Sequence, residues 1–378
     1  MGMRMQAVDG ADATAVRDAL PAALGGERPL ALGFEPAADQ TVPAGTAVVI
    51  ATSGSSGIPK RVILGGDALR ASAAATAARI GSGQWILALP SGYVAGLQVL
   101  VRSHLAGTDP ILLEGRFTAD AFVSATARAA GSHGLFTSLV PAQLAILIDA
   151  AEDPSVLRAL RAHTAILVGG QALPDGIRMR AADLRVPLVR TYGSSETSGG
   201  CVYDSIPLDG VAVQQVDGEL RLSGPMLATG YLGDPELTAR AFPTDPDGTR
   251  WYRTGDLGEF RDGVVEVHGR RDNVIVSGGI NISLDRVERI VRRVPGLEHA
   301  VVLGMPHERW GEASVIFADV GGQDGGRMLD AARALVADEI GRHARPVQLE
   351  AGLIPMLASG KPDRQLLRRM IHEVPPHE

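Results

Sequence analysis

The sequence predicts an α/β protein with a large N-terminal domain, whose mostly parallel sheets are flanked by helices, and a small α+β C-terminal domain. Over residues 47–189, short apolar runs alternate with helical segments at the spacing of βαβ units. Over 214–267, turn dipeptides such as Asp217 with Gly218 separate strand-like runs, which indicates a β-rich part. A compact α+β pattern follows the charged turn at 269–273.

We place a domain boundary at that charged turn. The N-terminal domain is expected over 1–271, with its β-rich part at about 205–268, and the C-terminal domain over 272–378. At 378 residues the chain is long enough for two or three domains with sizeable cores.

The individual elements follow from local pattern, because short β-branched runs favour strands and longer alanine-rich or periodic runs favour helices. Helices are expected at 11–20, 67–78, 94–106, 118–130, 141–150, 175–184, 284–294, 327–340 and 362–370. Strands are expected near 29–34 and at 47–51, 61–64, 85–89, 110–113, 135–139, 165–168, 186–190, 274–277, 300–303 and 313–320.

The segment 52–60 reads TSGSSGIPK and joins two of these strands. Its glycines let backbone N–H groups converge on one point, its hydroxyls add donors, and Lys60 adds a positive charge. This is chemistry for a polyphosphate, although a plain surface hairpin loop is the alternative. The loop is not a Walker A motif, because Pro59 precedes the lysine and a strand, rather than a helix, follows it.

Lysine usage supports a binding role for this loop. The chain contains only two lysines, Lys60 and Lys361, among its 36 basic side chains, and both stand in glycine-containing polar loops. An ammonium is a compact point charge and a guanidinium is a planar fork. The two lysines therefore indicate two sites that need the point charge, with chance placement as the alternative.

Composition excludes several classes of function. A net charge of −7 argues against a nucleic-acid-binding surface. The single cysteine, Cys201, forms no intramolecular disulfide, and we interpret it as a small buried side chain rather than a catalytic thiol. No run of 18 apolar residues and no close histidine spacing is present, so we expect a cytoplasmic protein without an integral membrane segment or a structural zinc.

Three further loops carry polar groups. The segments 168–174 (VGGQALP) and 191–197 (TYGSSET) follow expected parallel strands, at whose carboxyl ends ligands bind. The third, YRTGDLG at 252–258, places Asp256 between glycines, where it either caps a turn or binds a sugar diol.

Taken together, these loops resemble the adenylate-forming acyl-CoA synthetase superfamily. The motifs are TSGSSGIPK, GGQALP, YGSSET, YRTGDLG, GRRDNVIVSGGINI and ASGKPDR, in this order over about 47–369. Any one of them is weak evidence, but the set is specific. The resemblance implies a mobile C-terminal domain with its hinge at Asp272.

It also implies roles for matching residues. The 52–60 loop would cradle the phosphates of ATP, Glu196 would help to hold Mg²⁺, and Asp256 would bind the ribose hydroxyls. Lys361 would reach from the small domain to the carboxylate and the α-phosphate, where it acts with Glu196 in catalysis. The residues implied to contact ATP or AMP are Thr52, Ser53, Gly54, Ser55, Ser56, Gly57, Lys60, Gly169, Gly170, Gln171, Thr191, Tyr192, Gly193, Ser194, Ser195, Asp256 and Arg270.

The implied reaction has two steps. A carboxylate attacks ATP to give an acyl-adenylate and pyrophosphate, and after rotation of the small domain the thiol of CoA attacks the adenylate. Gly278 and Gly279 resemble the segment that lines the pantetheine path. Adenylate-forming loops are shared by members that never use CoA, so the first step is supported better than the second.

Two segments, 89–97 (LPSGYVAGL) and 138–144 (SLVPAQL), are similar to the o-succinylbenzoate–CoA ligases of menaquinone biosynthesis. The few residues before the phosphate loop resemble the short actinobacterial form, and they leave open whether a homodimer partner completes the fold. Two positions depart from the usual pattern. Arg61 replaces a glycine, and Tyr93 stands where many relatives have histidine.

o-Succinylbenzoate carries a second, aromatic carboxylate, which is costly to bury without a cation or several donors. Arg102, on the helix after Gly96, is the candidate cation, and a surface arginine is the alternative. The other candidates for the acyl pocket are Tyr93, Ser138 and Ser194.

Rival functions remain open at this point. They are a CoA ligase for another aryl or medium-chain acid, an acyl-AMP ligase that delivers to a carrier protein, and a nucleotide-binding regulatory protein that has lost catalysis. The presence of both Lys361 and Glu196 argues against the last.

Overall fold

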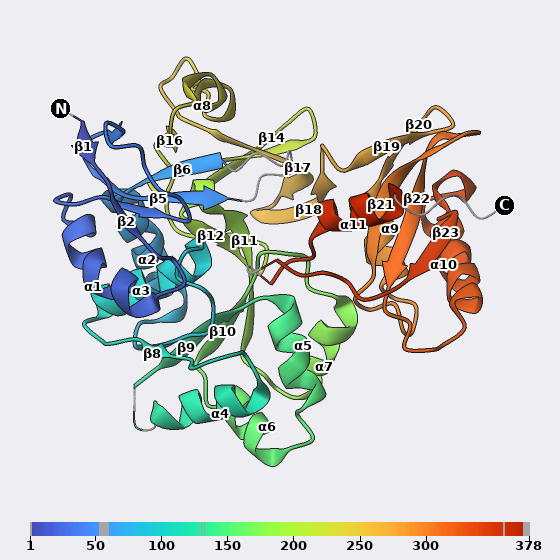
Figure 1. Cartoon of the computed structure of the whole chain (residues 1–378), viewed down its shortest axis with the longest axis horizontal. Helices are drawn as coiled ribbons and strands as arrows, with labels where there is room; N and C mark the ends of the chain where they lie inside the picture. The colour runs from blue at the N-terminus through green and yellow to red at the C-terminus, as the bar shows by residue number, and fades with distance from the viewer. Residues whose placement is uncertain (1, 53–59, 130, 132, 358–359, 373–378) are drawn as a thin grey trace.

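The computed structural model describes residues 2–52, 60–129, 131, 133–357 and 360–372. It has the expected α/β architecture. The chain up to β18 (Val264–Arg270) builds a large lobe, and the chain from β19 (Val274–Ser277) builds a smaller one, drawn in orange and red in Figure 1. Asp272, the expected hinge, lies in the short turn between these two strands.

A seven-stranded sheet forms the centre of the large lobe. Its strand order is β13-β12-β11-β10-β9-β7-β8. The five strands from β11 to β8 run parallel, and β12 and β13 are antiparallel additions at one edge. The strands are β7 (Gln84–Leu87), β8 (Ile111–Leu112), β9 (Leu135–Leu139), β10 (Ala165–Val168), β11 (Leu188–Ser194), β12 (Gly199–Tyr203) and β13 (Ile206–Pro207).

A five-stranded sheet of order β16-β6-β5-β3-β2 carries the strands that flank the 52–60 segment. As expected from the sequence, those two strands pair with each other in antiparallel register. The strands are β2 (Gln6–Val8), β3 (Leu30–Leu32), β5 (Thr46–Thr52), β6 (Lys60–Gly65) and β16 (Gly230–Tyr231), and a separate ladder joins β1 (Met3–Arg4) to β4 (Thr41–Val42).

Helices cover both faces of the seven-stranded sheet. The helix pair α2 (Gly66–Ile80) and α3 (Val94–Ala106) contacts strands of both sheets and shares their core with α1 (Ala13–Leu24). A second core lies under the remaining helices, α4 (Ala119–Arg128), α5 (Pro141–Asp149), α6 (Pro154–Arg161) and α7 (Asp175–Asp183).

The β-rich part is a four-stranded antiparallel sheet of order β14-β15-β17-β18. Its turns are those expected from the sequence, since Asp217, Gly218, Asp262 and Gly263 all have positive φ, as type I′ hairpins require. The further elements are β14 (Ala212–Val216), β15 (Glu219–Ser223), β17 (Tyr252–Arg261) and the helix α8 (Pro235–Ala241).

The small lobe has its own cores, one of which lies between its sheet and two helices. Its strand order is β20-β19-β22-β21, with β23 paired to β22. The elements are β20 (Ile280–Ser283), β21 (Val301–His307), β22 (Gly311–Ala318), β23 (Gln348–Ala351), α9 (Leu284–Val291), α10 (Gly325–Glu339) and α11 (Arg364–His372). Among the helices of the described residues, none has the length and apolar character needed to cross a membrane.

One buried histidine makes the stability of the large lobe depend on pH. The His163 ring stacks on Phe122 at 5.2 Å, and its Nδ1 lies 2.9 Å from the Ala159 carbonyl oxygen. Burial lowers the pKa of His163 from 6.5 to about 4. Between these values the unfolded chain binds a proton that the folded chain does not, so stability falls as the pH falls, by about 3 kcal/mol for this group.

We therefore expect the free energy of unfolding of His163→Phe to fall less than that of the wild type between pH 6.5 and pH 4. Urea unfolding at a series of pH values measures this difference, and the carboxylates common to both proteins cancel in the comparison. Parallel pH profiles would show that His163 takes up its proton normally in the folded protein.

Candidate active site

Two of the loops expected to bind a nucleotide meet where β10 and β11 end, at the carboxyl edge of the parallel strands. Gly169 donates its N–H to the carbonyl oxygen of Leu139, at 3.3 Å, which ties the β10 loop to the end of β9. A Cβ atom on Gly169 would lie 2.3 Å from Thr191 Oγ1, so only glycine fits there. Gly170 has a φ of +82°, a conformation that favours glycine.

The segment 191–197, expected to be a loop, is instead mostly strand. β11 continues through Ser194, and a 3₁₀ turn over Ser195–Thr197 leads back into antiparallel β12. Glycines make this possible, because a Cβ on Gly193 would lie 2.2 Å from the carbonyl oxygen of Gly199. The pairing places Tyr192 and Ser194 at defined positions on a sheet.

Asp256 also lies within a strand, so its expected position in a loop is wrong. It is part of β17, opposite Arg270 of β18. Its carboxylate accepts a hydrogen bond from Tyr192 Oη at 2.7 Å and one from Arg270 Nη1 at 3.2 Å, and among the described residues it caps no turn. Burial raises the pKa of Asp256, and these two partners oppose the rise. A carboxylate has about four acceptor positions, so room remains for two hydroxyls of a diol.

Arg270 connects this carboxylate to the expected hinge. Besides Asp256, its guanidinium donates to both carboxylate oxygens of Asp272, at 3.0 and 3.2 Å, and to the carbonyl oxygen of Thr254. Its backbone N–H donates to Asp285 of α9 at 2.6 Å. One residue therefore joins the large lobe, the turn between the lobes and the first turn of a small-lobe helix.

Lys361 comes from the small lobe and lies against the β10 loop. In Figure 1 the red segment before α11 crosses toward the large lobe. Gln171 Nε2 donates to the carbonyl oxygen of Gly360 at 3.3 Å, and Lys361 Cε lies 3.5 Å from where a Cβ on Gly170 would be. Lys361 stays exposed to solvent, yet the surrounding protein desolvates its ammonium and lowers its pKa, while Glu196 acts in the opposite direction.

Glu196 is buried, with 8% of its surface exposed, although it carries a carboxylate. Its Oε1 accepts a hydrogen bond from Tyr231 Oη at 2.9 Å, and its backbone carbonyl oxygen accepts one from the N–H of Ala228. Within the described ranges no hydrogen bond is made to the second carboxylate oxygen. That oxygen is available to a cation.

The structure describes the two end residues of the 52–60 segment, which is expected to bind phosphate. Thr52 pairs with Lys60 across the β5–β6 hairpin, and Thr52 Oγ1 donates to the carbonyl oxygen of Lys60 at 3.2 Å. The Lys60 ammonium lies 5.7 Å from the centre of the Tyr231 ring. The other residues expected to bind phosphate, Ser53, Gly54, Ser55, Ser56 and Gly57, lie outside the described residues.

Arg102 is buried, so the alternative of a surface arginine is wrong. Only 7% of its surface is exposed, and its guanidinium lies 5.0 Å from the centre of the Trp85 ring. Its Nη2 is 3.4 Å from Tyr203 Oη, and its Nε is buried without a partner among the described residues. Burial lowers the pKa of Arg102, and the Tyr203 phenol acts in the opposite direction. The chain thus buries a cation for which the described residues supply no carboxylate.

The other candidates for the acyl pocket lie on elements around α3. Tyr93 precedes this helix, Ser138 is buried in β9, which α3 contacts, and Ser194 ends β11. Ser194 Oγ is buried and interacts with the side chain of Tyr252. Hydrogen bonds among Arg102, Tyr93, Ser138 and Ser194 are absent from the described part of the chain, so their grouping stays a prediction.

Gly278 and Gly279 form the tight turn between β19 and β20. Both have positive φ, and the N–H of Gly278 donates to the carbonyl oxygen of Trp310 at 2.8 Å. A role for this turn in the path of CoA stays a prediction.

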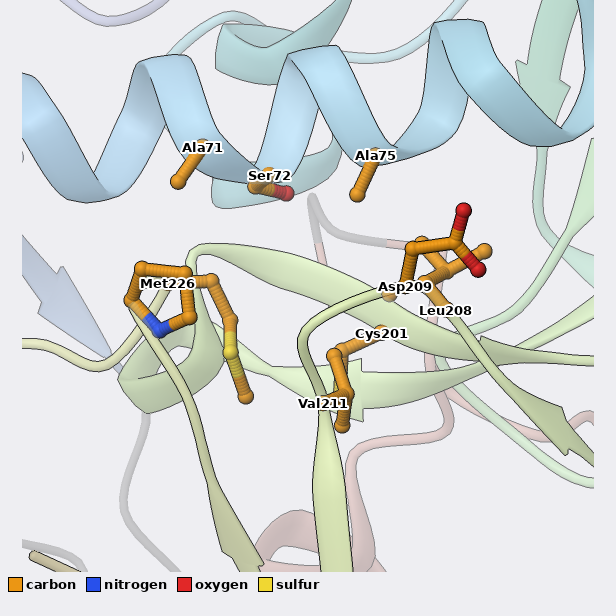
Figure 2. Close-up of a pocket in the computed structure, with 10 residues that line it drawn as sticks. Ala71, Ser72, Ala75, Cys201, Leu208, Asp209, Val211 and Met226 are labelled. Atoms are coloured by element: carbon orange, nitrogen blue, oxygen red, sulfur yellow. The ribbon is translucent and has the colours of Figure 1, made fainter. Parts of the chain in front are cut away.

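A small cavity lies away from these groups, between α2 and β12 (Figure 2). Its volume of about 10 Å³ is room for about one water molecule. Cys201 lines it, and burial raises the pKa of this thiol to about 12. The thiol is therefore unreactive, in agreement with its interpretation as a small buried side chain.

Comparison with known proteins gives the family. Residues 6–232 match the family described as AMP-binding enzyme, and residues 286–361 match the AMP-binding enzyme C-terminal domain. The first match alone covers more than half of the chain. The chain belongs to the AMP-binding enzyme family.

Individual members of the AMP-binding enzyme family resemble the chain along most of its length. A Mycobacterium tuberculosis protein named "Probable 2-succinylbenzoate--CoA ligase" is 39% identical over 334 residues, which are 85% of this chain and 84% of that protein. A medium-chain fatty-acid–CoA ligase of Escherichia coli is 29% identical over 355 residues, covering 86% of this chain and 61% of the relative. The structure of the Bacillus subtilis o-succinylbenzoate CoA synthetase with its acyl-adenylate shares the fold, with a TM-score of 0.74 and 21% identity over 98% of this chain and 84% of that one.

Members of the AMP-binding enzyme family use ATP, and the residues present fit a magnesium ion bound together with it. Among the described residues no cluster of three or more histidine, cysteine or carboxylate side chains forms a cage for a metal. Mg²⁺ usually takes only one or two carboxylates and completes its shell with phosphate oxygens and water. The available oxygen of Glu196 suits that arrangement.

Sequence reasoning missed two tyrosines of this family member's site. Tyr231 touches both Glu196 and Lys60, and Tyr203 touches Arg102. Both partners of Tyr231 are distant in sequence, so no local pattern identifies it. Its place became evident only from the pairing of β16 with β6.

Proposed function

We propose that the chain is an ATP-dependent o-succinylbenzoate–CoA ligase of menaquinone biosynthesis. The observation that carries this proposal is the similarity, over 85% of the chain, to the M. tuberculosis relative of that name. The buried guanidinium of Arg102 supports the choice of acid, because o-succinylbenzoate brings a second carboxylate that needs such a partner.

In the first step the aliphatic carboxylate of the acid attacks the α-phosphorus of ATP, and pyrophosphate leaves. Tyr192, Asp256 and Arg270 hold the nucleoside, and the 52–60 loop holds the phosphates. Lys361, placed beside Gly170, offsets the repulsion between the two anions and stabilises the charge that develops in the transition state. Mg²⁺ bound near Glu196 would neutralise part of the phosphate charge.

In the second step the thiol of CoA attacks the acyl carbon, the thiol proton is released, and AMP leaves. Lys361 lies beside the β10 loop, which supports its role in the first step. Rotation about Asp272 withdraws Lys361 and brings the Gly278–Gly279 turn toward the site.

Pyrophosphate release tests this function. The protein is incubated with ATP, Mg²⁺ and o-succinylbenzoate, with and without CoA, and benzoate and octanoate serve as control acids. We expect sustained turnover only with o-succinylbenzoate and CoA together. Turnover with a control acid would keep the two-step chemistry and reject the choice of acid.

A CoA ligase for a medium-chain acid is the second candidate, in line with the E. coli relative. A plain aliphatic acid brings no second carboxylate and would leave Arg102 buried without a partner, so the structure favours it less. The same assay distinguishes a CoA ligase from an enzyme that delivers the acyl group to a carrier protein. For the latter enzyme, free CoA would not increase turnover.

A further inference from the structure

Tyr231 contacts both Glu196 and Lys60, the two residues proposed to bind the metal and the phosphates of ATP. Its hydroxyl donates to Glu196 Oε1 at 2.9 Å, and its ring face lies 5.7 Å from the ammonium of Lys60, within the range of a cation–π contact. The three residues come from three separate elements, the 3₁₀ turn after β11, the start of β6, and β16.

The position of Tyr231 is fixed by its backbone. β16 pairs with β6, with Tyr231 opposite Val62, so the tyrosine follows any movement of the strand that begins at Lys60. Its N–H donates to Thr238 Oγ1 of α8 at 2.9 Å. A Cβ on the neighbouring Gly230 would lie 2.4 Å from Thr238 Cγ2, so the close approach of α8 requires this glycine.

The segment that contains Tyr231 makes two hydrogen bonds to Glu196. Ala228 donates to its backbone carbonyl oxygen at 2.8 Å, and Tyr231 donates to its side chain. In the described ranges this hydroxyl is the only hydrogen-bond donor to the buried carboxylate.

We propose that Tyr231 is a positioning residue of the ATP site, whose hydroxyl orients Glu196 toward the metal that accompanies ATP and whose ring holds Lys60 at the phosphate loop. The hydroxyl occupies one carboxylate oxygen and thereby directs the other at the metal. This inference rests on the proposed role of Glu196 in the ligase reaction.

The test separates the two contributions by isothermal titration calorimetry of the full chain, without acid or CoA, so that no turnover occurs. Each protein is titrated with ATP in the presence of Mg²⁺ and, separately, with ATP in the presence of EDTA. Tyr231→Phe removes only the hydroxyl. We expect it to weaken binding of Mg·ATP by about 10-fold or more, the usual cost of losing a partner of a metal ligand, while binding of metal-free ATP changes less than about twofold.

Tyr231→Leu removes the ring as well, so metal-free ATP should also bind more weakly, because Lys60 loses its aromatic contact. The matched control is Thr126→Val, which deletes another buried hydroxyl, one on α4 that donates to the carbonyl oxygen of Phe122 at 2.8 Å. It should leave the ratio of the two ATP affinities unchanged.

A double mutant keeps the test independent of small changes in folding. If the hydroxyl acts through Glu196, Tyr231→Phe should have no further effect on Mg·ATP binding in a Glu196→Gln background. Equal Mg·ATP affinities of the wild type and Tyr231→Phe, or additive effects in the double mutant, would overturn the inference alone. A wild type that does not prefer Mg·ATP to metal-free ATP would also remove the metal role proposed for Glu196.

Discussion

Replacing Lys361 with alanine is expected to slow formation of the acyl-adenylate by about 10²–10³-fold, the usual cost of removing one charge-stabilising donor from a transition state. In the structure Lys361 reaches the β10 loop from the small lobe, and its segment is anchored there by the hydrogen bond between Gln171 and Gly360. Single-turnover formation of adenylate and pyrophosphate measures the effect. Thioester formation from pre-made acyl-adenylate and CoA should be largely intact.

Two comparisons sharpen this prediction. Desolvation of its ammonium by the surrounding protein lowers the pKa of Lys361, so the wild-type adenylation rate should decline with rising pH earlier than a free lysine would cause. Lys361→Arg stays charged, and whatever activity it retains should lack that alkaline decline. Equal loss of both half-reactions in Lys361→Ala would contradict the assigned role.

Replacing Arg102 with alanine is expected to raise the KM for o-succinylbenzoate by about 30-fold or more, because truncating one partner of a buried charge pair costs about 2–5 kcal/mol. The KM for ATP should change little. The expectation follows from the burial of the guanidinium against Trp85 and from its unpaired Nε. Steady-state kinetics with each substrate varied in turn measures the two constants.

The stability of the protein without substrate provides the control for Arg102. Arg102→Met keeps the apolar stem and removes a charge whose burial is uncompensated by any carboxylate of the described residues, so the melting temperature should not fall. The same variant should still lose affinity for the acid. Similar effects on the KM of both substrates, or a large loss of stability with an unchanged KM for the acid, would show that Arg102 is structural.

The order of elements was predictable from the sequence because it depends on local pattern. The helix at Val94–Ala106 and the strands at Leu135–Leu139 and Ala165–Val168 have the expected bounds. Two short helices, α6 and α8, were not expected, because a segment of eight residues or fewer is too short for its pattern to decide the structure.

The largest errors concern glycine-rich strands. Around Gly193 and Gly255 the sequence is typical of loops, but at Gly193 the glycine lets a neighbouring strand approach where a side chain would collide. Pairing with strands distant in sequence therefore determined that these segments are strands and not loops. Burial of Arg102 could not be predicted either. It depends on Trp85 and Tyr203, which lie on two strands, β7 and β12, outside helix α3.

The most direct test of the two-step reaction follows an oxygen atom. o-Succinylbenzoate labelled with ¹⁸O in its carboxylates is incubated with the protein, ATP, Mg²⁺ and CoA, and the products are analysed by mass spectrometry. An acyl-adenylate intermediate requires that one labelled oxygen leaves with AMP, so we expect singly labelled AMP together with the CoA thioester. Unlabelled AMP, or ADP and phosphate in its place, would contradict the account.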